Sequence, residues 1–201
     1  YNHKHLIEYC VNSILTQKTN FAFKIIILDD SSTDGTTEIL KKIQSEKPDK
    51  IKLIINESNL EPQKSATILA EQVNAKYLAW LDGDDYWCYE NKLQEQIDFL
   101  EANPEYAGCF HDAKVVHSNQ SNDIHYLHRT QNQWKTYSQF NNYSSDFLPW
   151  ALIERNIIPT ASLVFRYANL AEFIRSYNFS ELSLSWAMHL DIIKNSKFKY
   201  F

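Results

Sequence analysis

The chain has 201 residues, of which 44% are hydrophobic and 14% aromatic, and its formal net charge is −5. This composition predicts a soluble globular protein that buries a substantial core in one domain or one and a half. The acidic balance argues against duplex nucleic acid as a partner, because phosphate neutralisation by Lys and Arg drives that binding. No apolar stretch reaches the ~20 residues of a membrane span, and no secretory leader is evident at Tyr1.

Cysteine and glycine are both rare in this chain. Cys10, Cys88 and Cys109 are widely spaced and include no Cys-x-x-Cys pair. They indicate neither a disulfide framework nor a zinc site, and a reducing cytoplasm fits this pattern best. Gly35 and Gly83 each fall inside an acidic turn, so we expect backbone freedom to be needed there.

Helices and strands are predicted to alternate along the first half of the chain. Apolar residues at helical spacing predict a first helix over residues 6–15, with Asn2 as its N-cap. The further elements are a buried strand at 24–28, a helix marked by Ile39, Leu40 and Ile43, a strand at 51–55, a helix at 64–73, a strand at 77–81, a helix at 91–100 and a strand at 107–116. This alternation predicts an α/β fold with a mostly parallel sheet covered by helices on both faces.

The second half gives weaker signals. Residues 118–145 are polar and rich in Asn, Ser, Gln and Tyr, which we interpret as a lid or an insertion. A short helix is predicted at 147–154, a strand at 161–165 and an amphipathic helix at 186–193.

Two acidic turns follow directly after predicted strands. Their carboxylates are Asp29, Asp30 and Asp34 in the first turn and Asp82, Asp84 and Asp85 in the second. Ligands of such sheets bind at the C-terminal ends of the strands, so we expect both turns to converge on one site.

The second turn concentrates negative charge. At an effective dielectric of ~20 and roughly 5 Å, each close pair of carboxylates repels by about 3 kcal/mol unless a cation intervenes. The expected occupant is Mg²⁺ or Mn²⁺, held by one or two carboxylates and completed by substrate phosphates. A solvated acidic turn is the alternative interpretation.

Several separate motifs make the chain resemble a family 2 glycosyltransferase with the GT-A fold, which binds nucleotide-diphospho-sugars. Tyr1-Asn2 resembles the end of the family's first strand, IIILDDSSTDGT at 25–36 its nucleoside-binding turn, DGDDYW at 82–87 its metal-binding Asp-x-Asp, and residues 92–94 and 96–104 continue the likeness. Residues 158–162 (IPTAS) with Phe165-Arg166 resemble the acceptor-side segment of bacterial polysaccharide glycosyltransferases. The match is good over residues 1–108 and weak beyond them.

This resemblance implies an inverting, metal-dependent transfer of a sugar from a UDP-sugar to a hydroxyl. The acceptor would be a glycan or a lipid-linked molecule of bacterial surface polysaccharide synthesis. The resemblance places the divalent ion on Asp84 with Asp82 close by, and the nucleobase on Asp30 with Asp29 as a neighbour. A carboxylate can only accept hydrogen bonds, which suits the N3–H of uracil.

Structural alternatives accompany these assignments. Asp29 and Asp30 are also typical of helix capping, although Asp34 or Thr36 could cap the next helix without them. Lys64 could steady a phosphate, or it lies on a solvated helix face. Trp87 and, in the polar insertion, Trp134 are the tryptophans best placed to stack on sugar rings, whereas a tryptophan usually belongs to a core.

The general base of an inverting transfer is the main departure from the family pattern. Related enzymes place an Asp just before a Trp near the start of a late helix, and here Ser185 precedes Trp186. A serine needs an activator of its own to act at neutral pH. The nearest carboxylates, Glu181 and Asp191, are the candidate bases, and a catalytically silent nucleotide-sugar-binding module is the alternative function.

The resemblance also implies an organisation and a compartment. Residues 1–117 would form the nucleotide-sugar-binding half, and residues 118–201, including the polar insertion at 118–145, the acceptor-side half of the same domain. We expect a cytoplasmic protein, and the resemblance admits peripheral contact with the inner face of the membrane. Members of the family have an apolar strand before the position of Tyr1-Asn2. Without that strand, the strand at 24–28 would have unpaired backbone groups. We therefore expect the chain to be part of a longer one.

Overall fold

The chain divides into two compact units in the computed structural model. The structure describes residues 1–60, 62–115, 125–126, 146–147, 156, 158–167, 173, 176, 183–193 and 196–201. Unit 1 comprises Tyr1–Lys76, Leu81–Glu95 and Tyr167–Asn178, and unit 2 comprises Tyr77–Trp80, Gln96–Arg166 and Phe179–Phe201. The predicted functional division at residue 117 stays a prediction.

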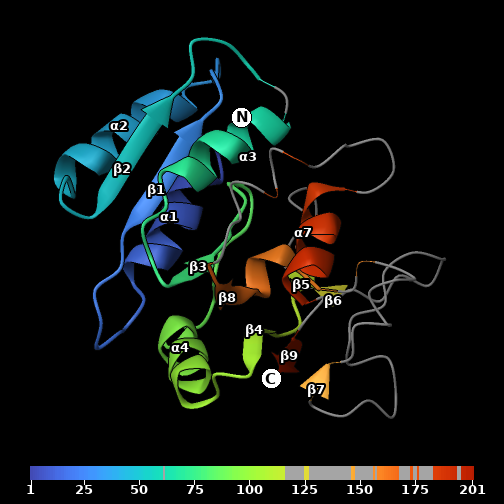
Figure 1. The fold of residues 1–201 in the computed structure, drawn as a ribbon. Helices are drawn as coiled ribbons and strands as arrows, with labels where there is room; N and C mark the ends of the chain where they lie inside the picture. Colours follow the sequence, from blue (N-terminus) through green and yellow to red (C-terminus); the bar gives the residue numbers. More distant parts are fainter. Residues whose placement is uncertain are drawn as a thin grey trace. The chain divides into compact units, whose positions relative to one another are not determined.

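Unit 1 is built on a pair of parallel strands, β1 (Ile25–Asp29) and β2 (Ile51–Ile55), in which Asp29 lies opposite Ile55. Its helices are α1 (Ile7–Leu15), α2 (Thr36–Glu46) and α3 (Pro62–Glu71), as Figure 1 shows. These elements are confirmed, with ends shifted by no more than about two residues from the predicted ones. Among the described residues β1 pairs only with β2, so the strand expected before Tyr1 stays a prediction.

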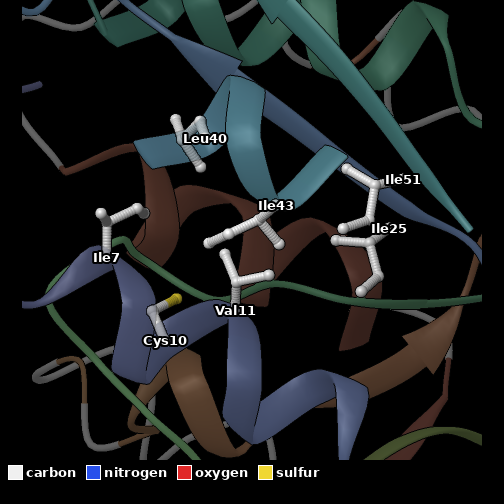
Figure 2. Close-up of a cluster of buried hydrophobic side chains, with 7 residues drawn as sticks. All are labelled: Ile7, Cys10, Val11, Ile25, Leu40, Ile43 and Ile51. Carbon is white, nitrogen blue, oxygen red and sulfur yellow. The ribbon is translucent and has the colours of Figure 1, made fainter. Parts of the chain in front are cut away.

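The two faces of the β1–β2 pair are covered by different helices. On one face, α1, α2 and both strands contribute to a buried cluster made of Ile7, Cys10, Val11, Ile25, Leu40, Ile43 and Ile51 (Figure 2). On the other face, Nζ of Lys52 donates a hydrogen bond to Oε1 of Gln72, just after α3 (2.6 Å). Since successive side chains of a strand alternate between faces, Asp29 points toward α2 and Asp30 toward α3.

Unit 2 contains a mixed five-stranded sheet in the order β3-β8-β4-β9-β7. Its strands are β3 (Tyr77–Ala79), β4 (Tyr106–Phe110), β7 (Asp146–Phe147), β8 (Val164–Arg166) and β9 (Lys197–Tyr200). The parallel pairing predicted from the sequence holds for β1–β2 and for β4–β9, whereas the other pairs of this sheet are antiparallel. Two of these antiparallel pairs arise because β8, from late in the chain, inserts between β3 and β4, and the third joins β7 to β9.

The remaining elements are α4 (Lys92–Ala102), β5 (Lys114–Val115) paired with β6 (His125–Tyr126), a short 3-10 turn at Thr160–Ser162 and α7 (Leu184–Ile193). The predicted strand at 107–116 ends early at Phe110, and the predicted strand at 161–165 begins as the 3-10 turn. The helix predicted at 147–154 starts inside β7 and otherwise lies outside the described residues, as does most of the insertion at 118–145.

No helix in the described ranges is both long enough and apolar enough to cross a membrane.

Within unit 1, the segment that precedes α1 is tied to the first acidic turn by its backbone amides and by the side chain of Asn2. Four hydrogen bonds join the two: Asn2 N–H to Ser32 Oγ (2.9 Å), His3 N–H to Thr36 Oγ1 (2.9 Å), Lys4 N–H to Asp34 Oδ2 (3.0 Å), and Thr33 N–H to Asn2 Oδ1 (2.9 Å). Residues 2–4 therefore run along the turn at residues 32–36.

The prediction that Asn2 caps α1 is wrong. The helix is preceded by Leu6, which supplies no side-chain cap, and Asn2 lies four residues further back with a positive φ of 57°. Asn tolerates this left-handed conformation better than most residues do. Its side chain is used at the acidic turn, a contact that the local sequence pattern could not reveal.

Asp34 fixes the start of α2. Its Oδ1 accepts hydrogen bonds from the backbone N–H of Thr36 (3.0 Å) and from Thr36 Oγ1 (2.6 Å). Gly35, between them, has a φ of 102°, which explains the glycine at this position. The hydrogen bond from the Thr36 hydroxyl, with further help from the Lys4 and Thr36 amides, lowers the pKa of Asp34 to about 2.

This cap predicts an acid-sensitive contribution to stability. Because the pKa of Asp34 is lowered in the folded chain, its charge stabilises the fold above the ordinary value of 3.8 and loses that effect as the pH falls toward about 2. Asp34→Asn should lower the free energy of unfolding at pH 5, and its difference from the parent should shrink steadily between pH 5 and pH 2. Urea unfolding at stepped pH measures this difference, and a gap of constant size over that range would contradict the assignment.

Candidate functional site

Asp29 ends β1 as a buried charge. Its side chain is only 2% exposed, and its oxygens accept hydrogen bonds from the hydroxyl of Ser32 at Oδ1 (2.5 Å) and from that of Thr37 at Oδ2. A buried carboxylate is costly unless it is hydrogen-bonded, so these hydroxyls hold the turn against the first turn of α2. Both oxygens already have donors from the protein, and direct contact between Asp29 and a nucleotide stays a prediction.

Asp30 faces the opposite side of the β1–β2 pair. Its Oδ1 accepts hydrogen bonds from Nδ2 of Asn56 (2.7 Å) and from the backbone N–H of Leu60 (3.0 Å). Burial raises the pKa of Asp30, but these two hydrogen bonds and the nearby hydroxyl of Ser65 outweigh burial and lower the pKa below its ordinary value. At neutral pH, Asp30 is therefore a charged hydrogen-bond acceptor.

Asn56 is a site residue that the sequence analysis missed. A signal for it exists, because the parallel register that places Asp29 opposite Ile55 also places Asp30 beside Asn56, one residue further along each strand. The backbone N–H of Asn56 donates to the carbonyl of Asp29 (3.0 Å), which continues the ladder past the end of β2.

The second acidic turn is anchored to α1 by its backbone. The carbonyl of Asp82 accepts a hydrogen bond from the N–H of Asp85 (3.0 Å) and one from the thiol of Cys10 (3.5 Å). A Cβ added at Gly83 would lie 3.3 Å from Cδ1 of Ile7 and 3.5 Å from the ring of His3. Gly83 has no positive φ, so the expected need for backbone freedom holds only at Gly35, and a side chain at position 83 would crowd Ile7.

His3 connects the two acidic turns. Its backbone N–H bonds to Thr36, which follows the first turn, and its ring lies against Gly83 in the second. The two turns therefore lie close together, with His3 between them. The positions of the predicted strand ends indicated such a convergence.

The second turn carries a concentrated negative field. Partial desolvation, followed by the charges of Asp84 and Asp82, raises the pKa of Asp85 to about 6, although the residue keeps an exposed surface. Burial, followed by the charges of the same three aspartates, raises the pKa of the Cys10 thiol to about 12. Such crowding of carboxylates is relieved by a cation.

Hard carboxylate oxygens in an exposed turn fit Mg²⁺ or Mn²⁺ chemically. In the described part of the chain, however, no three His, Cys, Asp or Glu side chains form a group that could hold a metal ion. An ion on this turn would therefore take several of its ligands from outside the protein, such as phosphate oxygens and water.

Two other predicted binding residues lie near these turns in unit 1. The backbone N–H of Trp87 donates to Oγ of Ser13 (3.0 Å), and the ammonium of Lys92, a residue only 4% exposed, lies 4.4 Å from the centre of the Trp87 ring. One face of that ring is thus covered by a cation. Lys64 is exposed in the first turn of α3, next to Ser65, and its contact with a phosphate stays a prediction.

The late helix α7 belongs to unit 2. On it, Ser185 Oγ lies 3.4 Å from Nδ2 of Asn156 and 3.4 Å from the hydroxyl of Ser183, and among the described residues it has no carboxylate partner. Oδ1 of Asn156 lies 3.0 Å from Nδ1 of His189, which is completely buried, and burial lowers the pKa of His189 to about 3.

The structure describes one of the two candidate bases. Asp191 is partly buried on α7. Glu181 lies outside the described residues, and so does Trp134. The identity of the base stays a prediction.

Comparisons with known proteins show that this chain is similar to glycosyltransferases. An uncharacterized protein of Mycobacterium tuberculosis is 27% identical over 190 residues, which are 94% of this chain and 51% of that protein. WfaP of Escherichia coli, a UDP-Glc:α-D-GlcNAc-diphosphoundecaprenol β-1,3-glucosyltransferase, is 39% identical over 101 residues, or 50% of this chain and 38% of WfaP. The chain thus spans about half the length of the first relative and less of the second.

A solved structure shares the fold. The crystal structure of S. aureus TarS 1-349 in complex with UDP matches with a TM-score of 0.68 at 19% identity, and the match covers 100% of this chain and 55% of that one. This likeness confirms the GT-A type of α/β fold. The family model described as Glycosyl transferase family 2 matches residues 1–169. The chain therefore belongs to glycosyltransferase family 2.

Proposed function

We propose that this chain binds a UDP-sugar with Mg²⁺ or Mn²⁺ and transfers the sugar, with inversion, to a hydroxyl of a glycan or lipid-linked acceptor. The proposed setting is bacterial surface polysaccharide synthesis, in the cytoplasm or at the inner face of the membrane. The observation that carries this proposal is the meeting of the two acidic turns at His3. This meeting supports a single donor site in which Asp30 would accept a hydrogen bond from the base and the carboxylates of the second turn would hold an ion.

The nucleoside end of the donor is assigned to Asp30. Its carboxylate stays charged at neutral pH and lies at the C-terminal edge of a parallel strand pair, where ligands of such sheets bind. There it would accept the N3–H of uracil. WfaP, which shares 39% identity over 101 residues, is named for a UDP-Glc donor and a diphosphoundecaprenol acceptor, and this supports the same class of substrates.

The diphosphate end is assigned to the second turn. Asp84, with Asp82, would hold the ion, and Lys64 and Trp87 would line the donor site. When bound, a divalent ion acts as a Lewis acid that stabilises negative charge on the leaving diphosphate. The backbone of this turn is held against α1, because the carbonyl of Asp82 accepts a hydrogen bond from the Cys10 thiol and Gly83 packs closely against Ile7.

A binding experiment tests this proposal. We expect Mn²⁺ to strengthen the binding of UDP to the parent chain by at least about tenfold, equivalent to ~1.4 kcal/mol, because the ion links Asp84 to the diphosphate. Asp84→Asn, which keeps the shape of the side chain and removes its charge, should abolish that gain. Isothermal titration calorimetry with and without Mn²⁺ measures both affinities.

The matched control is Asp49→Asn, which removes a charge from an exposed residue just before β2, at the other end of the strand pair. This variant should retain the full effect of Mn²⁺. A parent chain that binds UDP equally well with and without Mn²⁺, or an Asp84→Asn variant that keeps the gain, would refute the metal assignment.

A catalytically silent nucleotide-sugar-binding module is the second candidate function. It is favoured by Ser185, which occupies the position of the family's base and contacts Asn156 and Ser183, neither of which accepts a proton at neutral pH.

Turnover separates the two functions. If the chain is an enzyme, incubation with UDP-sugars and Mn²⁺ should release UDP, by transfer or by slow hydrolysis. Glu181→Gln or Asp191→Asn, whichever removes the base, should slow that release by about a hundredfold or more, and the other variant then serves as the control. A chain that binds a UDP-sugar and releases no UDP from any donor tested would establish the silent module instead.

A further inference from the structure

Most of the large apolar side chains that the described residues leave exposed belong to two segments of unit 1. One is the beginning of α1 with the residues before it, and the other directly follows the second acidic turn. We call four of these side chains the tyrosine patch: Leu6 (37% exposed), Tyr9 (70%), Tyr86 (49%) and Tyr89 (48%). The donor site proposed above uses none of the four.

The segment that follows the second acidic turn runs along α1. Three hydrogen bonds join the two: Cys10 Sγ–H to the carbonyl of Asp82 (3.5 Å), Trp87 N–H to Ser13 Oγ (3.0 Å), and Gln17 Nε2 to the carbonyl of Tyr89 (2.8 Å). These bonds advance from Cys10 to Gln17, which is a rise of about 10 Å along a helix. Tyr86 and Tyr89 therefore lie at successive levels beside α1.

The other two members of the patch lie on the same side of the helix. Leu6 comes four residues before Cys10, and Tyr9 comes four residues before Ser13. Residues at this spacing are neighbours on a helix surface. Because Cys10 and Ser13 both hold the second segment, Leu6 and Tyr9 border that segment one turn earlier. The tyrosine patch thus begins near the second acidic turn and extends away from it along α1.

The backbone that carries these rings is held in place before any ligand binds. The bonds to α1 fix the segment on which Tyr86 and Tyr89 lie, and the hydroxyl of Tyr89 donates a hydrogen bond to Oε1 of Glu95. A tyrosine ring offers a large contact area at a small cost in conformational entropy. Such a preorganised surface gains affinity because little has to be ordered on binding.

The charges around the patch indicate what kind of ligand it fits. Its acidic neighbours are Asp82, Asp84, Asp85 and Glu95. The ammonium of Lys18, which is also near Tyr89, is paired with the carboxylate of Glu90 (2.5 Å). Anionic lipid is attracted by Lys and Arg that flank apolar side chains, so this acidic surrounding disfavours a membrane surface. An uncharged ligand fits it better.

Exposed tyrosines at the edge of a sugar-transfer site suit a saccharide. The C–H face of a sugar ring packs on an aromatic face, and its hydroxyls can bond to phenol hydroxyls and to carboxylate oxygens. The patch follows α1 over about 10 Å, which is longer than a single sugar ring. It can therefore contact successive units of a glycan chain.

We propose that the tyrosine patch binds the sugar units of an uncharged glycan acceptor, whose chain extends from the second acidic turn along α1. The inference rests on the proposed function, because the end of the acceptor has to reach a donor sugar at that turn. It deepens that function by naming a glycan chain, and not only a terminal sugar or a lipid, as what this part of the protein recognises.

The test uses linear, uncharged oligosaccharides of glucose, galactose and N-acetylglucosamine, each as a disaccharide and as a hexasaccharide. In an NMR titration with UDP and Mn²⁺ present, the parent should bind the hexasaccharide of at least one series at least about tenfold more tightly than the disaccharide. Tyr86→Ala and Tyr89→Ala should each weaken hexasaccharide binding by about fivefold, because each removes one aromatic contact. Tyr86→Phe keeps the ring and should retain most of the affinity.

Phe201→Ala is the matched control, because it removes an exposed aromatic ring that belongs to unit 2. It should leave hexasaccharide binding unchanged, and thermal unfolding shows whether each variant keeps the fold. If the parent binds no hexasaccharide, or if both alanine variants bind it as the parent does, the inference is refuted. It is also refuted if these variants lose only binding to vesicles of phosphatidylcholine and phosphatidylglycerol, or only self-association in sedimentation.

A parallel measurement of UDP binding separates this inference from the proposed function. Tyr86→Ala and Tyr89→Ala should bind UDP with Mn²⁺ as the parent does. If Mn²⁺ strengthens UDP binding but no glycan binds, only the role of the tyrosine patch is refuted. A parent chain that binds no UDP would refute the proposed function and this inference with it.

Discussion

Two adjacent carboxylates at the end of β1 point to opposite faces of a two-stranded sheet. Because of this alternation, they have different hydrogen-bond partners. Asp29 turns toward α2, where the hydroxyls of Ser32 and Thr37 donate hydrogen bonds to it and fix the turn. Asp30 turns toward α3, where Asn56 and the backbone of Leu60 donate hydrogen bonds to its Oδ1. Asp29 thus secures the loop that follows β1, and Asp30 is the aspartate that we propose as the ligand-binding residue.

The second constraint is the short segment before α1. Its backbone amides bond to the first acidic turn, and the ring of His3 lies against Gly83 in the second. A ligand that binds both turns needs them at a fixed separation, and a rigid segment packed between them provides it. A side chain at position 83 would crowd this region, since a Cβ there would lie 3.3 Å from Cδ1 of Ile7.

The sequence predicted much of unit 1 because each of its elements carries a local signal. Apolar runs marked the buried strands, helical spacing marked the core faces of the helices, and the acidic residues after two strands marked the edge where they meet. Pairings between distant segments carry no such signal, which is why the insertion of β8 between β3 and β4 was missed. The use of Asn2 at the turn at residues 32–36, some thirty residues away in sequence, was missed for the same reason. Asn56 could have been found by aligning the two parallel strands residue by residue.

The central claim is that one nucleotide spans both acidic turns of unit 1. A crystal structure of the chain with UDP and Mn²⁺ tests it most directly. The account predicts a single UDP whose uracil N–H donates a hydrogen bond to the carboxylate of Asp30 and whose diphosphate shares the ion with Asp84. A nucleotide bound away from Asp30, or an ion that Asp84 does not coordinate, would contradict it.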